Sequence, residues 1–184
     1  MCGIFGGVGI NKKESLECIN SIHRGNDGIQ VIEFENNVVF ASRRHLVKIS
    51  GNEKNDNNCD QPYISNDKKI AIIFNGEFYN FEFYKNKLKK KSVVFNSTGD
   101  TEVFLKLYEN EGIKFLYDKN IDSLFSIAIL DIKNDKIFLA RDWPGRIPLY
   151  YYYDNKRFIF SSELKGFKPL KNLSLQKPIE LEPG

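Results

Sequence analysis

The order of apolar and polar residues predicts a chain built mainly of short strands. Apolar runs of strand length, separated by turn residues, predict strands at residues 3–8, 29–34, 38–42, 70–74, 92–95, 124–131, 136–141, 149–153 and 157–161. The run at 70–74 is apolar throughout, which is typical of a strand buried on both faces. It ends in Asn75-Gly76, which we place just beyond this strand.

Helical periodicity is present in three segments. Leu16, Ile19 and Ile22 recur every three residues and predict a helix over residues 14–23, and two more helices are expected at 80–90 and from Asp100 through 108. Asp100 is expected to cap the last helix with its side chain. Since two helices lie near the middle of the chain, between strand-rich halves, we expect an α+β sandwich of packed sheets. Residues 51–58 are nearly all polar and predict a mobile surface loop, and residues 168–184 are expected to be irregular.

Composition narrows the class of protein. With 184 residues, 41% hydrophobic and 14% aromatic, the chain can form one domain with a substantial core, and no repeat or second domain is evident. A net charge of +3 is too small to indicate nucleic acid as a partner. The lysine-rich run from Lys85 to Lys91 is interpreted as the solvated end of a helix, where cations are favourable.

The start of the chain and its cysteines indicate a cytoplasmic protein. Neither a secretory signal nor an apolar stretch long enough for a membrane span is found. Cys2, Cys18 and Cys59 are odd in number and widely spaced, so they do not predict a disulfide framework. Cys18 and Cys59 are interpreted as ordinary free thiols. With two histidines and no Cys-x-x-Cys pair, no metal site is expected.

Cys2 is the strongest candidate for chemistry. Once Met1 is removed, this residue carries both a thiol and the free α-amino group. The reference pKa values of these groups, about 8.5 and roughly 7.7–8.0, allow the amine to take the thiol proton near neutral pH. A nucleophile beside a base is the requirement of covalent acyl transfer, although a cysteine at this position can also be an ordinary residue.

Six motifs occur in order along the chain. They are Met1-Cys2-Gly3-Ile4-Phe5-Gly6, His23-Arg24-Gly25-Asn26-Asp27, Asn75-Gly76-Glu77-Phe78-Tyr79-Asn80, Gly99-Asp100-Thr101-Glu102, residues 140–151 (Ala-Arg-Asp-Trp-Pro-Gly-Arg-Ile-Pro-Leu-Tyr-Tyr) and Ser161-Ser162-Glu163-Leu164-Lys165. Together they resemble the glutaminase domain of class II glutamine amidotransferases, most closely that of glutamine-hydrolysing asparagine synthetases. The resemblance covers nearly the whole chain, residues 1–184, as one domain. It implies the four-layer αββα sandwich of the N-terminal-nucleophile hydrolases.

The resemblance also implies roles for individual residues. Cys2 would be the nucleophile and its α-amine the base, while Asn75 and Gly76 would form the oxyanion hole. A side-chain amide and an unobstructed backbone N–H are suitable donors for a developing oxyanion. Asn-Gly is also a common tight turn, which is the structural alternative here. The residues implied to bind glutamine are Arg44, Val47, Asn75, Gly76, Glu77, Gly99 and Asp100.

Departures from the family pattern leave part of this assignment open. Residues 44–48 (Arg-His-Leu-Val-Lys) differ from the usual motif, so either Arg43 or Arg44 could bind the α-carboxylate of glutamine. A guanidinium group suits a carboxylate better than a lysine does. Asp100 would bind the α-amine while also beginning a helix. Gly99 stands where a serine is frequent, and Asn26 replaces a turn proline.

The chain lacks the other half of an asparagine synthetase. No phosphate-binding or dinucleotide-binding glycine motif is found in its 184 residues. We therefore expect it to release ammonia to a synthetase domain or subunit that alone would need ATP and magnesium, with no cofactor of its own; a homo-oligomer is also allowed. Two other hypotheses stay open: a non-catalytic glutamine-binding module of the same fold, and an N-terminal-nucleophile amidase that acts on another amide.

Overall fold

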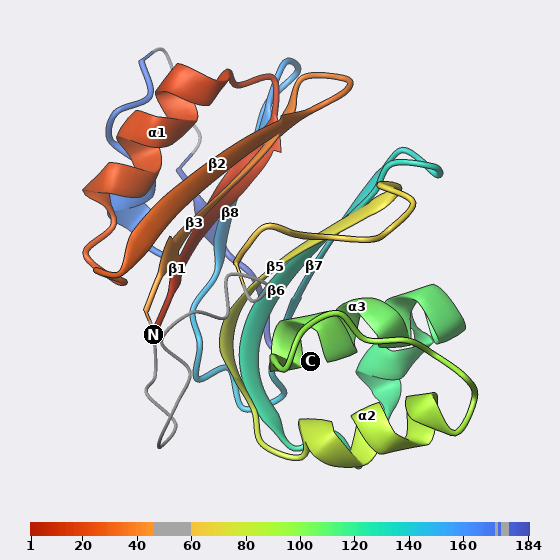
Figure 1. Cartoon of the computed structure of the whole chain (residues 1–184). Coiled ribbons are helices and arrows are strands. Elements are labelled where there is room, and N and C mark those ends of the chain that lie inside the picture. The colour runs from red at the N-terminus through yellow and green to blue at the C-terminus, as the bar shows by residue number, and fades with distance from the viewer. Residues whose placement is uncertain (46–59, 172, 174–176) are drawn as a thin grey trace.

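The computed structural model describes residues 1–45, 60–171, 173 and 177–184 (Figure 1). Its strands are β1 (Gly3–Val8), β2 (Gly28–Phe34), β3 (Val38–Arg44), β4 (Tyr63–Ile64), β5 (Ile70–Phe78), β6 (Ser123–Asp131), β7 (Lys136–Arg141), β8 (Tyr150–Tyr153), β9 (Phe158–Ser161) and β10 (Ile179–Glu180). The α-helices are α1 (Lys12–Ser21), α2 (Phe81–Lys89) and α3 (Asp100–Glu111), and η2 (Gly112–Tyr117) and η3 (Leu164–Phe167) are 3₁₀ helices.

These elements form four layers. One antiparallel sheet has the order β10-β8-β9-β1-β3-β2, and a second has the order β4-β5-β6-β7. The two sheets face each other, with α1 on the outer face of the first and α2 and α3 on the outer side of the second (Figure 1). The predicted αββα sandwich and the α+β class are confirmed.

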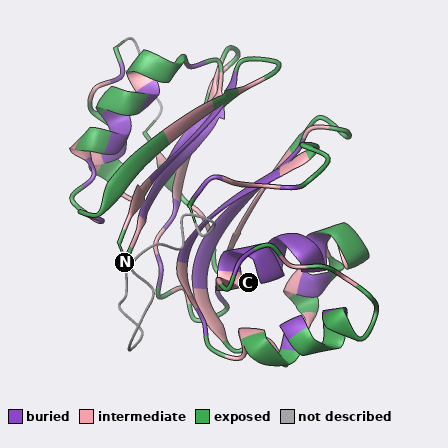
Figure 2. Ribbon diagram, viewed as in Figure 1, coloured by how far each residue is buried: buried purple, intermediate pink, exposed green. Residues whose placement is uncertain are grey.

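The core has three apolar layers: one between the two sheets, one between the first sheet and α1, and one between the second sheet and α2 and α3. The alternation of side chains along the strands explains them. In β1, Ile4 faces the second sheet and Phe5 faces α1. In β5, Ile73 faces the first sheet and Phe74 faces α3. The central strands therefore lie buried in the middle of the molecule, while exposed residues lie on the edge strand β2, the outer sides of the helices and the turns (Figure 2). Because the central strands β1, β3, β5 and β6 pack apolar side chains on both faces in this way, their register is fixed.

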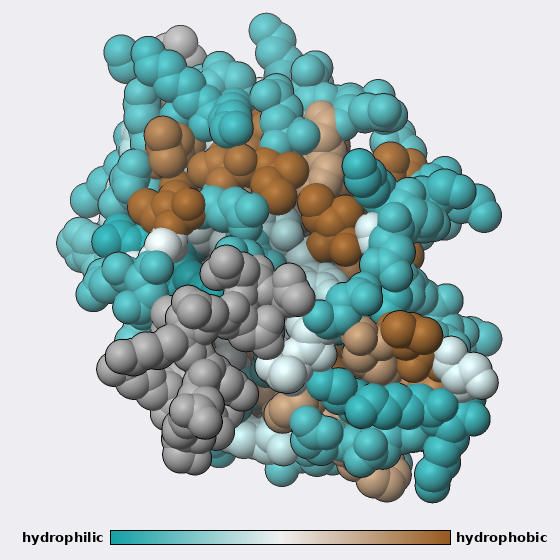
Figure 3. All heavy atoms as spheres, viewed as in Figure 1, coloured by the Kyte–Doolittle hydropathy of each residue, from teal (hydrophilic) through white to brown (hydrophobic). Residues whose placement is uncertain are grey.

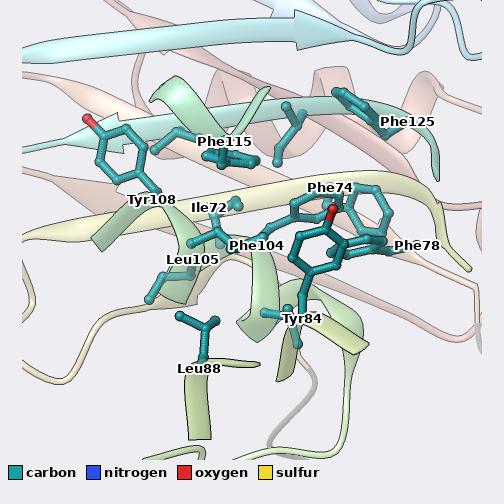
Figure 4. Close-up of a cluster of buried hydrophobic side chains, with 14 residues drawn as sticks. Ile72, Phe74, Phe78, Tyr84, Leu88, Phe104, Leu105, Tyr108, Phe115 and Phe125 are labelled. Carbon is teal, nitrogen blue, oxygen red and sulfur yellow. The ribbon is translucent and has the colours of Figure 1, made fainter. Parts of the chain in front are cut away.

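The layer beneath α3 is rich in aromatic residues. Phe104 stacks on Phe78 with ring centroids 4.4 Å apart and meets Phe74 edge-on at 5.1 Å (Figure 4). Such pairs stabilise the fold beyond their buried area. They hold the first turns of α3 against the end of β5, which brings Asp100 close to Gly76 and Phe78.

The edge strand β2 of the first sheet is largely exposed. Apolar residues gather along it in Figure 3, and Ile29 is 41% exposed. In the described part of the chain, no helix has both the length and the apolar character needed to cross a membrane. Within the same ranges, no cluster of three or more His, Cys, Asp or Glu side chains could hold a metal ion.

One predicted strand does not form, and two predicted elements have different ends. No strand forms at 92–95, where a turn and an irregular connection join α2 to α3 and Val94 is 71% exposed. Helix α1 begins at Lys12 rather than 14, because Asn11 and Glu14 form a capping box. The strand predicted at 70–74 continues to Phe78, so Asn75 and Gly76 lie inside β5 and do not form a tight turn.

The run from Lys85 to Lys91 was interpreted as solvated, and at Lys85 this was wrong. Lys85 is buried and donates to the carbonyl oxygens of Ser97 (3.1 Å) and Thr98 (3.3 Å). Buried Glu102 accepts the backbone N–H groups of Asn96 and Ser97. The connection before α3 is therefore held by hydrogen bonds from these two side chains to its backbone, and not by strand pairing. The predicted loop at 51–58 lies outside the described residues, as does Cys59, whereas Cys18 is a buried free thiol.

Candidate active site between the sheets

Cys2 and Arg44 lie side by side at one end of the first sheet. Gly3 pairs with Arg43 across β1 and β3, so the next pair in the register is Cys2 with Arg44. Since Ile4 and Phe40 face the second sheet, the alternation of side chains places Cys2 and Arg44 on that same face. Both side chains therefore face the space between the sheets.

The Cys2 thiol is held by the start of the following loop. The backbone N–H of His45 donates to its sulfur at 3.4 Å. Burial raises the pKa of the Cys2 thiol, while the His45 N–H, the terminal amine and Arg44 each lower it. The net direction is upward, so the thiol needs a base in order to become the nucleophilic thiolate.

The two candidate arginines have different surroundings. Arg43 lies on the α1 side of the sheet, where its guanidinium donates to the carbonyl oxygens of Gly25 (2.5 Å), Ile22 (2.6 Å) and Asn20 (3.2 Å). The Arg43 guanidinium is therefore engaged in bonds that join β3 to the end of α1 and to the segment that follows it. Arg44 lies near Cys2 and pairs with the half-exposed carboxylate of Asp60 at 2.5 Å. Of the two, only Arg44 faces the thiol.

Asn75 is completely buried on the opposite sheet. It has the same orientation as Ile73, into the space between the sheets, and β1 and β3 both lie against β5 across this space. Neither its side-chain nitrogen nor its side-chain oxygen has a hydrogen-bond partner. A buried carboxamide without partners costs on the order of 1–3 kcal/mol for each unpaired group. A buried polar group of this kind therefore calls for a functional explanation, such as binding of a ligand.

The backbone N–H of Gly76 lies on an open edge of β5. Strand β4 pairs only with Ala71 and Ile72, so within the described residues no strand covers this edge further along. On this edge the N–H of Phe74 donates to the side chain of Gln61 at 2.6 Å, and that of Phe78 to Asp100 at 3.2 Å. Alternation places the N–H of Gly76 between them, directed at the same edge.

Only glycine fits at position 76. A Cβ atom there would lie 1.9 Å from the carbonyl oxygen of Leu124 on β6, and φ is +157°. The absence of a side chain therefore lets β5 approach β6 closely at this residue. It also leaves the N–H unobstructed.

Asp100 begins α3, but it does not cap the helix as predicted. The N-cap residue is Gly99, which has an extended conformation and no side chain, so no side-chain hydrogen bond caps the helix. The Asp100 carboxylate instead accepts the N–H of Phe78. The pKa of Asp100 is raised to about 6, mainly by burial and also by the nearby charge of Glu77, while its hydrogen bonds oppose the shift.

Gln61 connects three elements of the site and was not identified from the sequence. Its side chain accepts the N–H of Phe74 and donates to Thr101 of α3 at 3.2 Å. Its carbonyl oxygen accepts the hydroxyl of Ser42 on β3. These bonds fix β3, β5 and α3 relative to one another. A single glutamine before a proline gives no sequence signal for such a role.

Two of the sequence motifs hold β1 in place. The N–H of Ile4 donates to the Ser162 hydroxyl at 2.9 Å, and the N–H of Ser162 donates to the Ile4 carbonyl. The Arg24 guanidinium pairs with Glu163 at 2.9 Å. Both contacts lie close to the start of β1 and therefore fix the position of Cys2.

The structure thus brings together most of the residues predicted for the site. Cys2, Arg44 and Asn75 face the same space, with Gly76 and Asp100 at the adjoining edge of β5. Glu77 lies close enough to Asp100 for its charge to act on it. Gly99 contributes only backbone. Val47 lies outside the described residues, so its predicted role stays a prediction.

Comparison with known proteins gives a consistent result. The pattern that defines the glutamine amidotransferase domain matches residues 1–180. The chain is 36% identical over 175 residues to asparagine synthetase [glutamine-hydrolyzing] 2 of Bacillus subtilis, covering 90% of this chain and 22% of that protein. It is 29% identical over 178 residues to asparagine synthetase B [glutamine-hydrolyzing] of Escherichia coli, covering 92% of this chain and 30% of that protein. The chain therefore spans less than a third of the length of these two relatives.

Solved structures support the fold. Glutamine phosphoribosylpyrophosphate amidotransferase of B. subtilis superimposes with a TM-score of 0.72 and 19% identity, over 100% of this chain and 46% of that one. A structure described as the allosteric regulatory enzyme of purine biosynthesis gives a TM-score of 0.78, also at 19% identity and over the same shares of the two chains. At this identity the likeness shows the fold alone. With the family pattern matched over nearly its whole length, the chain belongs to the glutamine amidotransferase domain family, and its relatives are glutamine-hydrolysing asparagine synthetases.

Proposed function

We propose that this chain hydrolyses L-glutamine to glutamate and ammonia through a γ-glutamyl thioester on Cys2. The observation that carries the proposal is the buried carboxamide of Asn75, without a partner and facing the same space as Cys2. A donor of this kind, buried and already in place, stabilises an oxyanion far better than a solvated one. The Gly76 N–H on the open edge of β5 is the second donor.

The reaction begins at the amino terminus. Met1 is 59% exposed, and its removal makes the α-amine part of Cys2 itself. This amine takes the thiol proton, and the thiolate attacks the carboxamide carbon of glutamine. Asn75 and Gly76 then stabilise the oxyanion of the tetrahedral intermediate. The protonated amine returns its proton to the leaving ammonia, and water attacks the thioester to release glutamate.

Two charged residues would bind the α-amino acid end of glutamine. Arg44 would bind the carboxylate through its guanidinium group, in place of Asp60. Asp100 would bind the α-ammonium group, with Glu77 adding negative charge beside it. These assignments and that of Val47 are proposals about roles, based on position and on the family resemblance.

The ammonia would pass to an acceptor domain or subunit that resembles the synthetase part of the relatives. That part would bind ATP and magnesium and complete a ligase reaction, for which aspartate is the commonest acceptor among such enzymes. A cytoplasmic location and a homo-oligomer, for which the exposed edge β2 offers a surface, stay predictions.

Glutamate release by the purified chain tests the proposal. We expect turnover with glutamine, loss of turnover in Cys2→Ala, and strongly raised KM in Arg44→Ala and Asp100→Ala. Glutamine binding without turnover, alone or with a synthetase partner, would favour a non-catalytic module. Turnover that Arg44→Ala and Asp100→Ala leave unchanged would favour an amidase acting on another amide.

A further inference from the structure

Ser126 lies directly opposite Asn75 in the second sheet. The two residues pair across β5 and β6, and both are 0% exposed. In β6, Ala128 and Leu130 face the space between the sheets, so alternation places Ser126 on that face too. Directly opposite residues of an antiparallel pair have Cβ atoms about 4.5–5.5 Å apart. The hydroxyl of Ser126 and the carboxamide of Asn75 are therefore neighbours.

Both side chains are buried without hydrogen-bond partners. Among the described residues, five buried side-chain nitrogen or oxygen atoms have no partner, and three of them are Asn75 Nδ2, Asn75 Oδ1 and Ser126 Oγ. Leaving such atoms unpaired is costly, so a cluster of them requires an explanation. The concentration of three unpaired atoms at one point of the sheet indicates a functional arrangement.

The described neighbours of this pair within the second sheet supply none of the missing bonds. Ile73 and Ala128, the next residues on the same face, are apolar. Arg141 pairs with Ser126 from β7, but its guanidinium already donates to the carbonyl oxygens of Gly145 and Ile147 and to the C-terminal segment. Each of these two side chains lies on the residue directly opposite the other, and in this structure no hydrogen bond joins them.

The chemistry of an oxyanion hole decides how the two would pair. A carboxamide has a donor end and an acceptor end, and only the donor, Nδ2, can stabilise an oxyanion. Turned the other way, Oδ1 would face the negative charge and repel it. A hydroxyl that donates to Oδ1 holds the carboxamide in the productive orientation. The Ser126 hydroxyl, on the residue directly opposite, would form this bond if the two side chains rotated toward each other.

We propose that Ser126 is a positioning residue for Asn75: its hydroxyl donates to Asn75 Oδ1 and so directs Nδ2 toward the oxyanion. The inference rests on the proposed hydrolysis of glutamine. It accounts for all three unpaired atoms, because Ser126 satisfies Oδ1 and the oxyanion satisfies Nδ2. Glutamine binding through Arg44 and Asp100 does not depend on it.

Matched variants at position 126 test this role. Threonine and valine have nearly the same shape and differ in the hydroxyl, so Ser126→Thr keeps the donor and Ser126→Val removes it. We expect kcat to fall roughly tenfold in Ser126→Val and Ser126→Ala, the value of one hydrogen bond of about 1.4 kcal/mol, with KM unchanged. Ser126→Thr should recover most of this loss. Ser15→Ala, which removes another buried hydroxyl without a partner, in α1, should leave kcat unchanged.

A second measurement does not require turnover. Urea unfolding of Asn75→Ala, Ser126→Ala and the double variant measures the coupling between the two side chains. The proposal predicts that the two single effects are not additive. Additive effects, or Ser126→Val as active as Ser126→Thr, would overturn the proposal, as would an increase in kcat on removal of the hydroxyl. If coupling is found but the wild type never releases glutamate, the proposed hydrolysis fails while the pairing of Ser126 with Asn75 stands.

Discussion

Asp100 accepts the backbone N–H of Phe78 at 3.2 Å, and this bond ties the first residue of α3 to the end of β5. It puts a buried carboxylate on the edge of β5 to which the N–H of Gly76 is directed, where the substrate would lie. Since burial raises its pKa to about 6, Asp100 changes charge in a range that kinetics can measure.

The first prediction concerns pH. Asp100 must be ionised to bind the α-ammonium group of glutamine, so kcat/KM should rise with pH through about 6. In Glu77→Gln the charge that raises this pKa is removed, and the rise should move to lower pH. An acidic limb that stays in place in Glu77→Gln would contradict the assignment, and kcat/KM measured from pH 4.5 to 8 decides it.

The second prediction separates function from stability. The pKa of Asp100 is higher in the folded chain than its ordinary value of 3.8, so the folded state binds more protons between about pH 4 and 6. Stability therefore falls as pH rises through this window and stays lower at pH 7. Asp100→Asn should raise the free energy of unfolding at pH 7 by about 1–2 kcal/mol while strongly raising the KM for glutamine.

The matching control is the same variant at pH 4. There the wild-type carboxyl is largely protonated, and the stability gained in Asp100→Asn should nearly vanish. A variant less stable than wild type at pH 7 would mean that the carboxylate holds α3 in place rather than serving the substrate.

The third prediction concerns Asp60, the partner of Arg44 in this structure. The two side chains form an ion pair at 2.5 Å, so Asp60 competes with the substrate carboxylate for the guanidinium. Asp60→Asn should lower the KM for glutamine severalfold and leave kcat unchanged. Glu82→Gln, an exposed change of the same charge on α2, is the control and should leave KM as it is. A raised KM in Asp60→Asn would show that Asp60 instead orients Arg44.

The fourth prediction concerns the backbone at Gly76. A Cβ there would lie 1.9 Å from the carbonyl oxygen of Leu124, so Gly76→Ala must push β5 from β6. We expect a loss of more than about 2 kcal/mol of unfolding free energy together with loss of turnover. At Gly28, where no atom lies within 4 Å of an added Cβ, alanine should be tolerated. Circular dichroism melts of the two variants compare them directly.

The sequence was most informative where chemistry restricts the choice of residue. Cys2, Asn75, Gly76 and Asp100 were selected through motifs, and the fold places them around one space between the sheets. Alternation along β3 then favours Arg44 over Arg43, a choice that the sequence alone left open. This choice requires the register of β1 against β3, which is a long-range property.

The wrong predictions share a physical cause. Residues 92–95 contain β-formers but have no neighbouring strand to pair with, and Lys85 and Glu102 hold the adjoining connection through side-chain bonds. The strand at 70–74 was predicted to end before Asn75-Gly76, yet pairing with β6 continues it to Phe78. Gln61 and Ser126 were missed because their roles arise only from neighbours far away in the chain.

The central claim is that Cys2, with its own free amine, carries the γ-glutamyl group. Mass spectrometry of the wild-type protein, quenched with acid during turnover of glutamine, tests it most directly. The account predicts a peptide that begins at Cys2, lacks Met1 and carries one γ-glutamyl group removable by hydroxylamine. Glutamine turnover by protein that retains Met1, or a γ-glutamyl group on any other residue, would contradict it.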